Sequence, residues 1–153
     1  ATIRAEQYCK KIRALRPDAQ ILSIPCPLLV PLVENGRFRP GDLVVETVVR
    51  EYLAPIKRAG ADTLVLGCTH YPLLQEVIAN ELGPGVTLID SGAQSARAAR
   101  ELLTRRDALN APDHTGACRY FVSDTVDSFS ALASVFLRRD VTGSVTQVDI
   151  TKY

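Results

Sequence analysis

Strand-like and helix-like segments alternate along almost the whole of this 153-residue sequence. Short apolar runs typical of buried strands are followed by longer segments whose apolar residues recur at helical spacing. Strands that alternate with helices in this way form parallel sheets covered by helices. We therefore predict an α/β fold, with a parallel sheet and helices on both of its faces.

The predicted elements are joined by short loops. Helices are expected over residues 3–15, 43–59, 72–82, 91–103 and 126–137, and strands over 20–24, 63–66, 86–89, 119–123 and 145–150. Two helix starts carry polar residues: Asp42 is a typical N-cap, and Ser91 and Gln94 have the spacing of a capping box. Three closely spaced prolines argue against regular helix or central strand and predict a stiff loop over residues 25–31.

Composition gives no reason to expect nucleic acid or a membrane as the partner rather than a small molecule. The formal net charge is +1, and 46% of the residues are hydrophobic, which is enough to bury a core. The longest apolar stretches fall well short of the roughly 20 residues that span a bilayer. The four cysteines are dispersed without CxxC pairing, which fits reduced cytosolic thiols, and with two histidines a structural zinc site is not expected. Because the sequence has no methionine, we expect it to be part of a longer or processed protein.

A cysteine and a histidine two residues apart follow the apolar run that ends at Gly67. Cys68 and His70 can project to the same side of extended chain, at the carboxyl end of a buried strand, where open α/β sheets bind ligands. Pro72 suits the first turn of a helix, and a helix N-terminus near Cys68 favours the reactive thiolate. On these residues alone, a nucleophilic or basic Cys68 and a merely buried Cys–His pair remain equally open.

The run from Gly67 to Leu74, GCTHYPLL, resembles the second catalytic-cysteine motif of glutamate racemases. Residues 26–34, CPLLVPLVE, look like another stretch of that family at the expected spacing from Cys68, and residues 2–4, Tyr8 and residues 90–92 also fit. The resemblance is most specific up to about residue 92. It implies an isomerase of the cytoplasm that converts L-glutamate to D-glutamate without a cofactor, for peptidoglycan synthesis, cell-wall biogenesis and cell shape.

The resemblance also implies roles for particular residues. Racemisation needs two acid/base groups on opposite faces of Cα, and thiols suit this task. Cys68 would take the proton from L-glutamate, and Thr69 and His70 would contact the substrate. Glu34 would orient His70 through a carboxylate–imidazole hydrogen bond, although such a glutamate is more often a solvated loop residue. We expect Tyr71 to pack beside the site. No cofactor and no metal are implied.

In family terms the sequence corresponds to only part of a two-lobe, pseudo-symmetric fold. The region with the first catalytic cysteine, in an Ala-Cys-Asn-Thr-like run, is absent. We expect residues 1–89 to form the lobe that carries Cys68, and residues 90–153 to be a return segment of the other, incomplete lobe. The missing N-terminal half is then an expected partner beside glutamate, a homodimer is compatible with the family, and the chain alone is expected to be inactive.

Three other functions are compatible with the same residues. The chain could belong to an aspartate or other amino-acid racemase of the same superfamily, although aspartate racemases tend to have a carboxylate where His70 stands here. It could be a cysteine hydrolase with Cys68 as nucleophile and His70 as base. It could also be an inactive isolated lobe that only binds a ligand or a partner.

Overall fold

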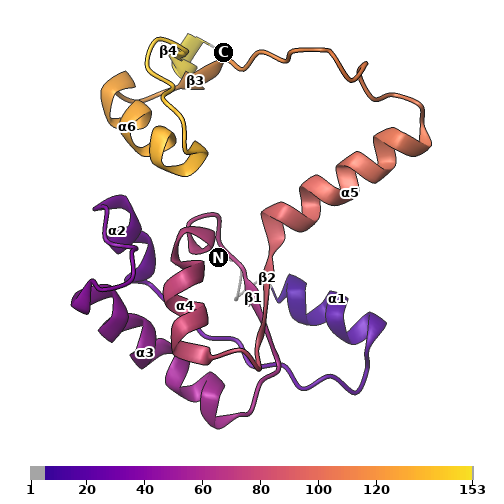
Figure 1. Cartoon of the computed structure of the whole chain (residues 1–153), viewed down its shortest axis with the longest axis vertical. Coiled ribbons are helices and arrows are strands. Elements are labelled where there is room, and N and C mark those ends of the chain that lie inside the picture. Colours follow the sequence, from indigo (N-terminus) through magenta and orange to yellow (C-terminus); the bar gives the residue numbers. More distant parts are fainter. Residues whose placement is uncertain (1–5, 153) are drawn as a thin grey trace. The chain divides into compact units, whose positions relative to one another are not determined.

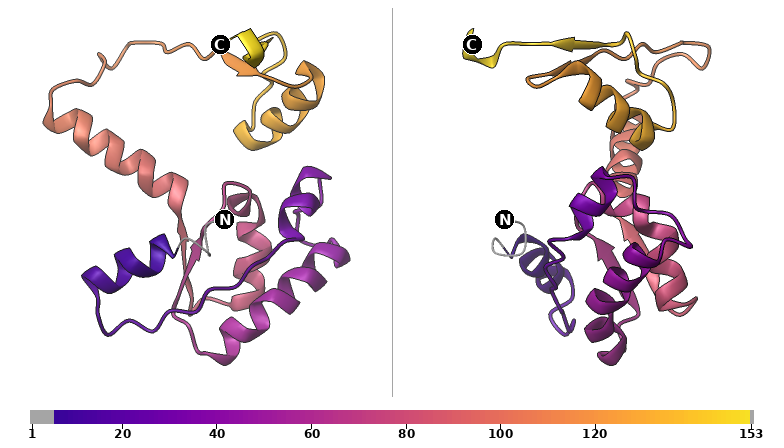
Figure 2. Two further views of the ribbon diagram at one scale, coloured as in Figure 1. Left: turned by 180° about the vertical axis from the view of Figure 1, so that it is seen from behind. Right: turned by 90° about the vertical axis from the view of Figure 1, so that its left-hand side faces the viewer.

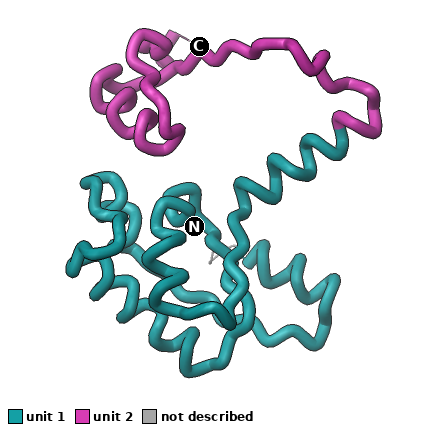
Figure 3. Tube along the Cα trace, in the orientation of Figure 1, with its two compact units in different colours: residues 1–102 teal, residues 103–153 magenta. Residues whose placement is uncertain are grey.

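The computed structural model describes residues 6–152 and divides into two compact units, residues 1–102 and 103–153 (Figure 3). The first unit contains α1 (Gln7–Leu15), α2 (Leu29–Glu34), α3 (Leu43–Arg58), β1 (Thr63–Leu66), the 3-10 helix η1 (Tyr71–Leu74), α4 (Gln75–Leu82), β2 (Thr87–Asp90) and most of α5 (Ser91–Arg105). The second contains β3 (Tyr120–Val122), α6 (Val126–Leu137), β4 (Val145–Gln147) and the 3-10 helix η2 (Ile150–Lys152). The predicted α/β class is confirmed. The predicted start of the first helix at Ile3 lies outside the described residues, and the predicted boundary near residue 90 stays a prediction.

The core of the first unit lies between its strands and the helices α3 and α4. Strands β1 and β2 pair in parallel, with Thr63 opposite Thr87 and Leu66 opposite Asp90. Helices α3 and α4 lie together on one side of this strand pair, and α1 lies on the other side (Figures 1 and 2). The buried apolar side chains come from α2, α3, β1, η1 and α4: Leu29, Val33, Val45, Val49, Leu53, Ile56, Leu66, Leu74, Val77 and Ile78. This packing fixes the carboxyl end of β1, where the cysteine motif begins.

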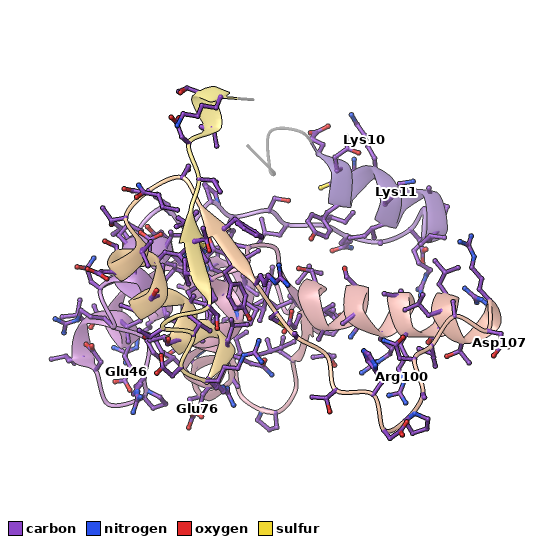
Figure 4. All side chains as sticks on the ribbon, turned by 90° about the horizontal axis from the view of Figure 1, so that it is seen from above. Lys10, Lys11, Glu46, Glu76, Arg100 and Asp107 are labelled. Carbon is purple, nitrogen blue, oxygen red and sulfur yellow. The ribbon has the colours of Figure 1, made fainter. Side chains whose placement is uncertain are left out.

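Charged side chains lie outside this core. Lys10 and Lys11 are exposed on α1 and extend away from the ribbon (Figure 4). Lys57 and Arg50 of α3 both reach Glu81 of α4, at 2.9 Å and 3.4 Å. The hydrogen bond from Lys57, followed by its charge, lowers the pKa of the Glu81 carboxyl, although burial opposes this. These ion pairs link the surfaces of α3 and α4.

The two predicted helix caps had different outcomes. At α3, an Asp42 carboxylate oxygen accepts a hydrogen bond from the N–H of Val44 at 3.0 Å, so the predicted N-cap is confirmed. At α5, the residue that accepts from the first free N–H groups is Asp90, at 2.8 Å from Gly92 N and 3.1 Å from Ala93 N. The Ser91 hydroxyl donates to the carbonyl of Leu66 instead, at 3.3 Å. The predicted capping box is therefore wrong, because Ser91 bonds to β1 while the preceding aspartate caps the helix.

Three further sequence predictions differ from the structure. Residues 25–31 are not all loop, because α2 begins at Leu29 and includes Pro31. Proline is tolerated there because the first turn of a helix has N–H groups without intrahelical partners. Residues 20–24 form no strand, since they make no backbone ladder with β1 or β2 in the described chain. The final predicted strand is shorter than expected, ending at Gln147.

The second unit has a small core. Strands β3 and β4 pair in parallel, with Tyr120 opposite Val145. Ala133 and Val141 are buried, whereas Phe121 is 61% exposed and Leu137 44% exposed. A two-stranded sheet with one helix covers little apolar surface, so this unit has few buried contacts to stabilise it. No helix within residues 6–152 is long and apolar enough to cross a membrane.

Candidate active site

The cysteine motif lies in the turn that joins β1 to η1. Strand β1 ends at the buried Leu66, and Gly67 leads into Cys68. Two backbone hydrogen bonds close the turn: Tyr71 N–H donates to the Cys68 carbonyl at 3.2 Å, and Leu73 N–H donates to the His70 carbonyl at 3.1 Å. The turn is therefore fixed at both ends, and it presents its side chains at the carboxyl end of β1, as predicted.

The structure brings the other three predicted site residues around the His70 imidazole. The Cys68 Sγ is 3.9 Å and the Thr69 Oγ1 is 3.3 Å from His70 Nδ1. On the other side of the ring, His70 Nε2 is 3.2 Å from Glu34 Oε1. The hydrogen bond expected between Glu34 and His70 is thus present, across 36 positions of sequence.

This arrangement allows the His70 imidazole to accept a proton from Cys68 or to donate one to it. When Nε2–H donates to Glu34, the neutral ring leaves Nδ1 free of a proton and able to accept one from the thiol of Cys68. In the charged imidazolium, Nδ1–H faces the sulfur of Cys68 and can donate to it. The side chain of His70 is 20% exposed and that of Glu34 is 48% exposed, so the carboxylate is accessible while the ring is largely enclosed.

The position of Glu34 on its helix does not favour a purely structural role. Glu34 is the last residue of α2, where the carbonyl end of the helix carries partial negative charge. A carboxylate is disfavoured there unless a cation or donor lies nearby. The nearby donor is His70, 3.2 Å away, and this contact offsets the unfavourable position of the carboxylate.

Tyr71 and Cys26 line the same region. The Tyr71 hydroxyl donates to the backbone carbonyl of Cys26 at 3.3 Å. Burial raises the pKa of Tyr71 to about 12, with smaller contributions from Cys26, Cys68 and Tyr52. Burial also raises the pKa of the Cys26 thiol to about 11. Both groups stay protonated near neutral pH, which agrees with the packing role expected of Tyr71.

Sequence reasoning missed a second thiol, at Cys118. This exposed residue lies two positions before Tyr120, and a hydrogen bond from Arg139 is the largest cause of the lowered pKa of its thiol. Arg139 also donates to the Tyr120 hydroxyl. The sequence shows that Cys118 and Tyr120 are two residues apart. It does not show the contact with Arg139, because α6 separates Arg139 from them along the chain.

These surroundings predict the order of thiol reactivity. In a Cys118→Ser background, we expect iodoacetamide to alkylate Cys68 at least about tenfold faster than Cys26 near neutral pH. The imidazole of His70 lies beside the Cys68 sulfur, whereas with a pKa of about 11 only roughly one Cys26 thiol in 3000 is ionised at about pH 7.5. Peptide mapping after brief alkylation measures the ratio. Faster labelling of Cys26 or Cys9 would contradict the geometry.

The described residues offer no alternative metal or apolar site at the motif. No three His, Cys, Asp or Glu side chains within residues 6–152 gather as metal ligands. A shallow groove of about 580 Å³ lies along α2 and α3, lined mainly by Leu28, Pro31, Leu32, Val44 and Val48. The lining of this groove includes neither Cys68 nor His70, so the chemistry of the site depends on the polar cluster.

Comparison with known proteins shows which family this chain resembles along most of its length. A glutamate racemase from Desulforudis audaxviator is 44% identical over 146 residues, which cover 92% of this chain and 53% of that protein. The chain belongs to the glutamate racemase family. The resemblance found in the sequence is confirmed, and the chain spans about half the length of the curated relatives it matches. No protein-family model matches the chain.

Solved glutamate racemases have the same fold over nearly the whole chain. The enzyme from Francisella tularensis, crystallised with D-glutamate, superposes with a TM-score of 0.85 at 31% identity and covers 99% of this chain and 56% of its own. The enzyme from Escherichia coli, crystallised with L-glutamate and the activator UDP-MurNAc-Ala, has a TM-score of 0.67 at 29% identity and covers 95% of this chain and 53% of its own. The fold is therefore that of a racemase lobe.

Proposed function

We propose that this chain supplies one of the two acid/base groups that racemise glutamate without a cofactor. The observation that carries the proposal is the arrangement of Cys68, His70 and Glu34 at the carboxyl end of β1, in a chain of the glutamate racemase family. The Cys68 thiolate takes the Cα proton from L-glutamate. A protonated group on the opposite face then gives a proton to the planar carbanion, which yields D-glutamate. In the reverse direction the Cys68 thiol is the donor.

The neighbours of Cys68 have supporting roles in this proposal. His70, 3.9 Å from the sulfur, stabilises the thiolate and contacts the substrate, while Glu34 holds the ring. The Thr69 hydroxyl and N–H are available to a substrate carboxylate. The group on the opposite face belongs to the part of the relatives that this chain does not cover, so the complete site needs that polypeptide as a partner. We keep residues 90–153 as the return segment into that second lobe.

We further propose that the product serves peptidoglycan synthesis in the cytoplasm. The Escherichia coli relative was crystallised with UDP-MurNAc-Ala, and N-acetylmuramic acid is a building block of peptidoglycan. A compartment that keeps thiols reduced is also required, because an oxidised Cys68 cannot accept a proton.

An aspartate racemase, and an isolated lobe that only binds ligand, are the alternatives that the following experiment separates.

Substrate protection tests the proposed site. We expect L-glutamate at ten times its Kd to slow alkylation of Cys68 by about tenfold in a mixture of this chain with the uncovered part of a relative. The reason is that a bound substrate occupies the space in front of the sulfur. Alkylation of Cys9, whose sulfur lies 3.6 Å from the Ser23 hydroxyl and which is not one of the proposed site residues, serves as the internal control.

Each outcome of this experiment is informative. Equal protection by L-aspartate would contradict the choice of glutamate and favour the broader superfamily. Protection without any racemisation, with both lobes present, would favour the ligand-binding lobe. No protection of Cys68 by either amino acid would overturn the assignment of the site.

A further inference from the structure

We infer that Tyr71 is a positioning residue, whose hydroxyl holds the segment that precedes α2 and thereby sets Glu34 against His70. The inference rests on the proposed function, because the contact between Glu34 and His70 matters for catalysis only if His70 works with Cys68. It goes beyond that function by assigning a task to Tyr71, whose hydroxyl donates to the backbone carbonyl of Cys26.

His70 and Tyr71, which are adjacent in the motif, form hydrogen bonds to opposite ends of residues 26–34. His70 Nε2 is 3.2 Å from the Glu34 carboxylate, at the carboxyl end of α2. The Tyr71 hydroxyl donates at 3.3 Å to the carbonyl of Cys26, three positions before α2 begins. Residues 26–34 are therefore held at both ends by consecutive residues of the β1–η1 turn, and a shift of either end changes the distance between carboxylate and imidazole.

Helix α2 by itself cannot set the distance between the Glu34 carboxylate and the His70 imidazole. It has six residues, and no side chain caps its N-terminus at Leu28. Helices of this length are not stable alone in water, so their orientation comes from tertiary contacts. Leu29 and Val33 are buried and fix how deeply α2 lies. Apolar contacts are not directional, however, whereas hydrogen bonds to the preceding backbone fix where the helix lies along its axis.

A second tyrosine supports the same segment from α3. The Tyr52 hydroxyl accepts a hydrogen bond from the Leu28 N–H at 3.4 Å, on the other side of Pro27 from the Cys26 carbonyl. Two phenols thus satisfy neighbouring backbone groups at the entrance to α2. Tyr71 is the more important of the two, since it alone also belongs to the turn that carries His70.

The state of the Tyr71 phenol suits positioning rather than proton transfer. The ring is partly buried, and burial raises the pKa of the phenol to about 12. The hydroxyl therefore stays protonated at neutral pH and keeps its donor role. Its proton is directed to the Cys26 carbonyl, so we assign it no step in moving the Cα proton.

The test compares Tyr71→Phe with the parent in the full chain by ¹⁵N NMR of the histidine rings. The sequence has two histidines, His70 and His114, so one His114→Gln spectrum assigns both. We expect Y71F to shift the His70 ring signals in the direction that Glu34→Gln shifts them, and the double variant to add nothing to E34Q. We also expect the alkylation rate of Cys68 to change by about fivefold, the effect of one hydrogen bond. Tyr120→Phe makes the same chemical change in the second unit and should leave the His70 signals unmoved.

Unchanged His70 signals in Y71F would overturn the inference, even if the variant were less stable, because lost stability alone would indicate a packing role. If circular dichroism shows that Y71F is unfolded, 3-fluorotyrosine at position 71 keeps the ring and strengthens the donor, and unmoved His70 signals in that protein would equally overturn it. The ring signals need no substrate. Failure of glutamate to protect Cys68 would therefore count against the proposed function alone, while the NMR result decides the role of Tyr71.

Discussion

Glutamate racemisation is expected to rise by about 10³-fold or more when this chain is mixed with a polypeptide that supplies the uncovered part of its relatives. The chain covers 53% of the length of its Desulforudis relative, and its proposed site has one thiol beside His70. Exchange of the Cα proton between two faces needs a second acid/base group, so the chain alone should stay near the uncatalysed rate. Polarimetry by circular dichroism on L-glutamate, at matched concentrations of both polypeptides, measures the increase.

Variants of this chain test whether the increase in rate depends on Cys68. Cys68→Ser in the mixture should return the rate to that of the chain alone, because the first proton transfer then lacks its base. His114→Gln is the matched control, since His114 lies in the loop of residues 110–116 outside the proposed site and should leave the rate unchanged. Turnover by the chain alone that Cys68→Ala abolishes would show that these residues contain a complete racemase site.

Hydrogen exchange is expected to be at least about thirtyfold faster in residues 90–153 than in the helices and strands of residues 20–89. Helix α5 has no buried residue, and the second unit buries mainly Ala133 and Val141 among its apolar side chains. The earlier segment contains Val45, Leu74 and most of the other fully buried side chains. Amides open more easily where fewer apolar contacts must separate.

Exchange measured by mass spectrometry on peptides of α4 and α6 gives the ratio most directly, because both helices are of similar type and differ in burial. Addition of the complementing polypeptide should slow exchange in residues 90–153 more than in α4, since exposed strand edges and apolar faces would then be covered. Equal protection of both segments in a chain that light scattering shows to be monomeric would contradict the division and indicate one self-sufficient domain.

Periodicity and local chemistry predicted much of the fold. The predicted helix over residues 126–137 and the predicted strand over residues 63–66 match α6 and β1. Asp42 was identified as a cap because a carboxylate two residues before a free N–H is a local arrangement. The motif that contains Cys68 was placed correctly at the end of β1 for the same reason, since an apolar run, a glycine and a proline define a strand–turn–helix within ten residues.

Pairing and long-range contact could not be predicted in this way. Residues 20–24 have the composition of a strand but pair with no strand in the described chain, and composition does not report pairing. Asp90 and Ser91 are both competent caps, and the carbonyl of Leu66, from a different strand, decided between them. Cys118 became notable only when the end of α6 brought Arg139 to it.

The sequence by itself determined the α/β class, the family and the residues with suitable chemistry, because these depend on short-range order and residue type. The tertiary structure alone decided how those residues meet. Glu34 and His70 are 36 positions apart, and their 3.2 Å contact exists because α2 forms despite Pro31 and packs against the η1 turn. A hydrogen bond requires its two atoms to be placed within a few tenths of an ångström, and such placement comes from the packed core rather than from any local pattern.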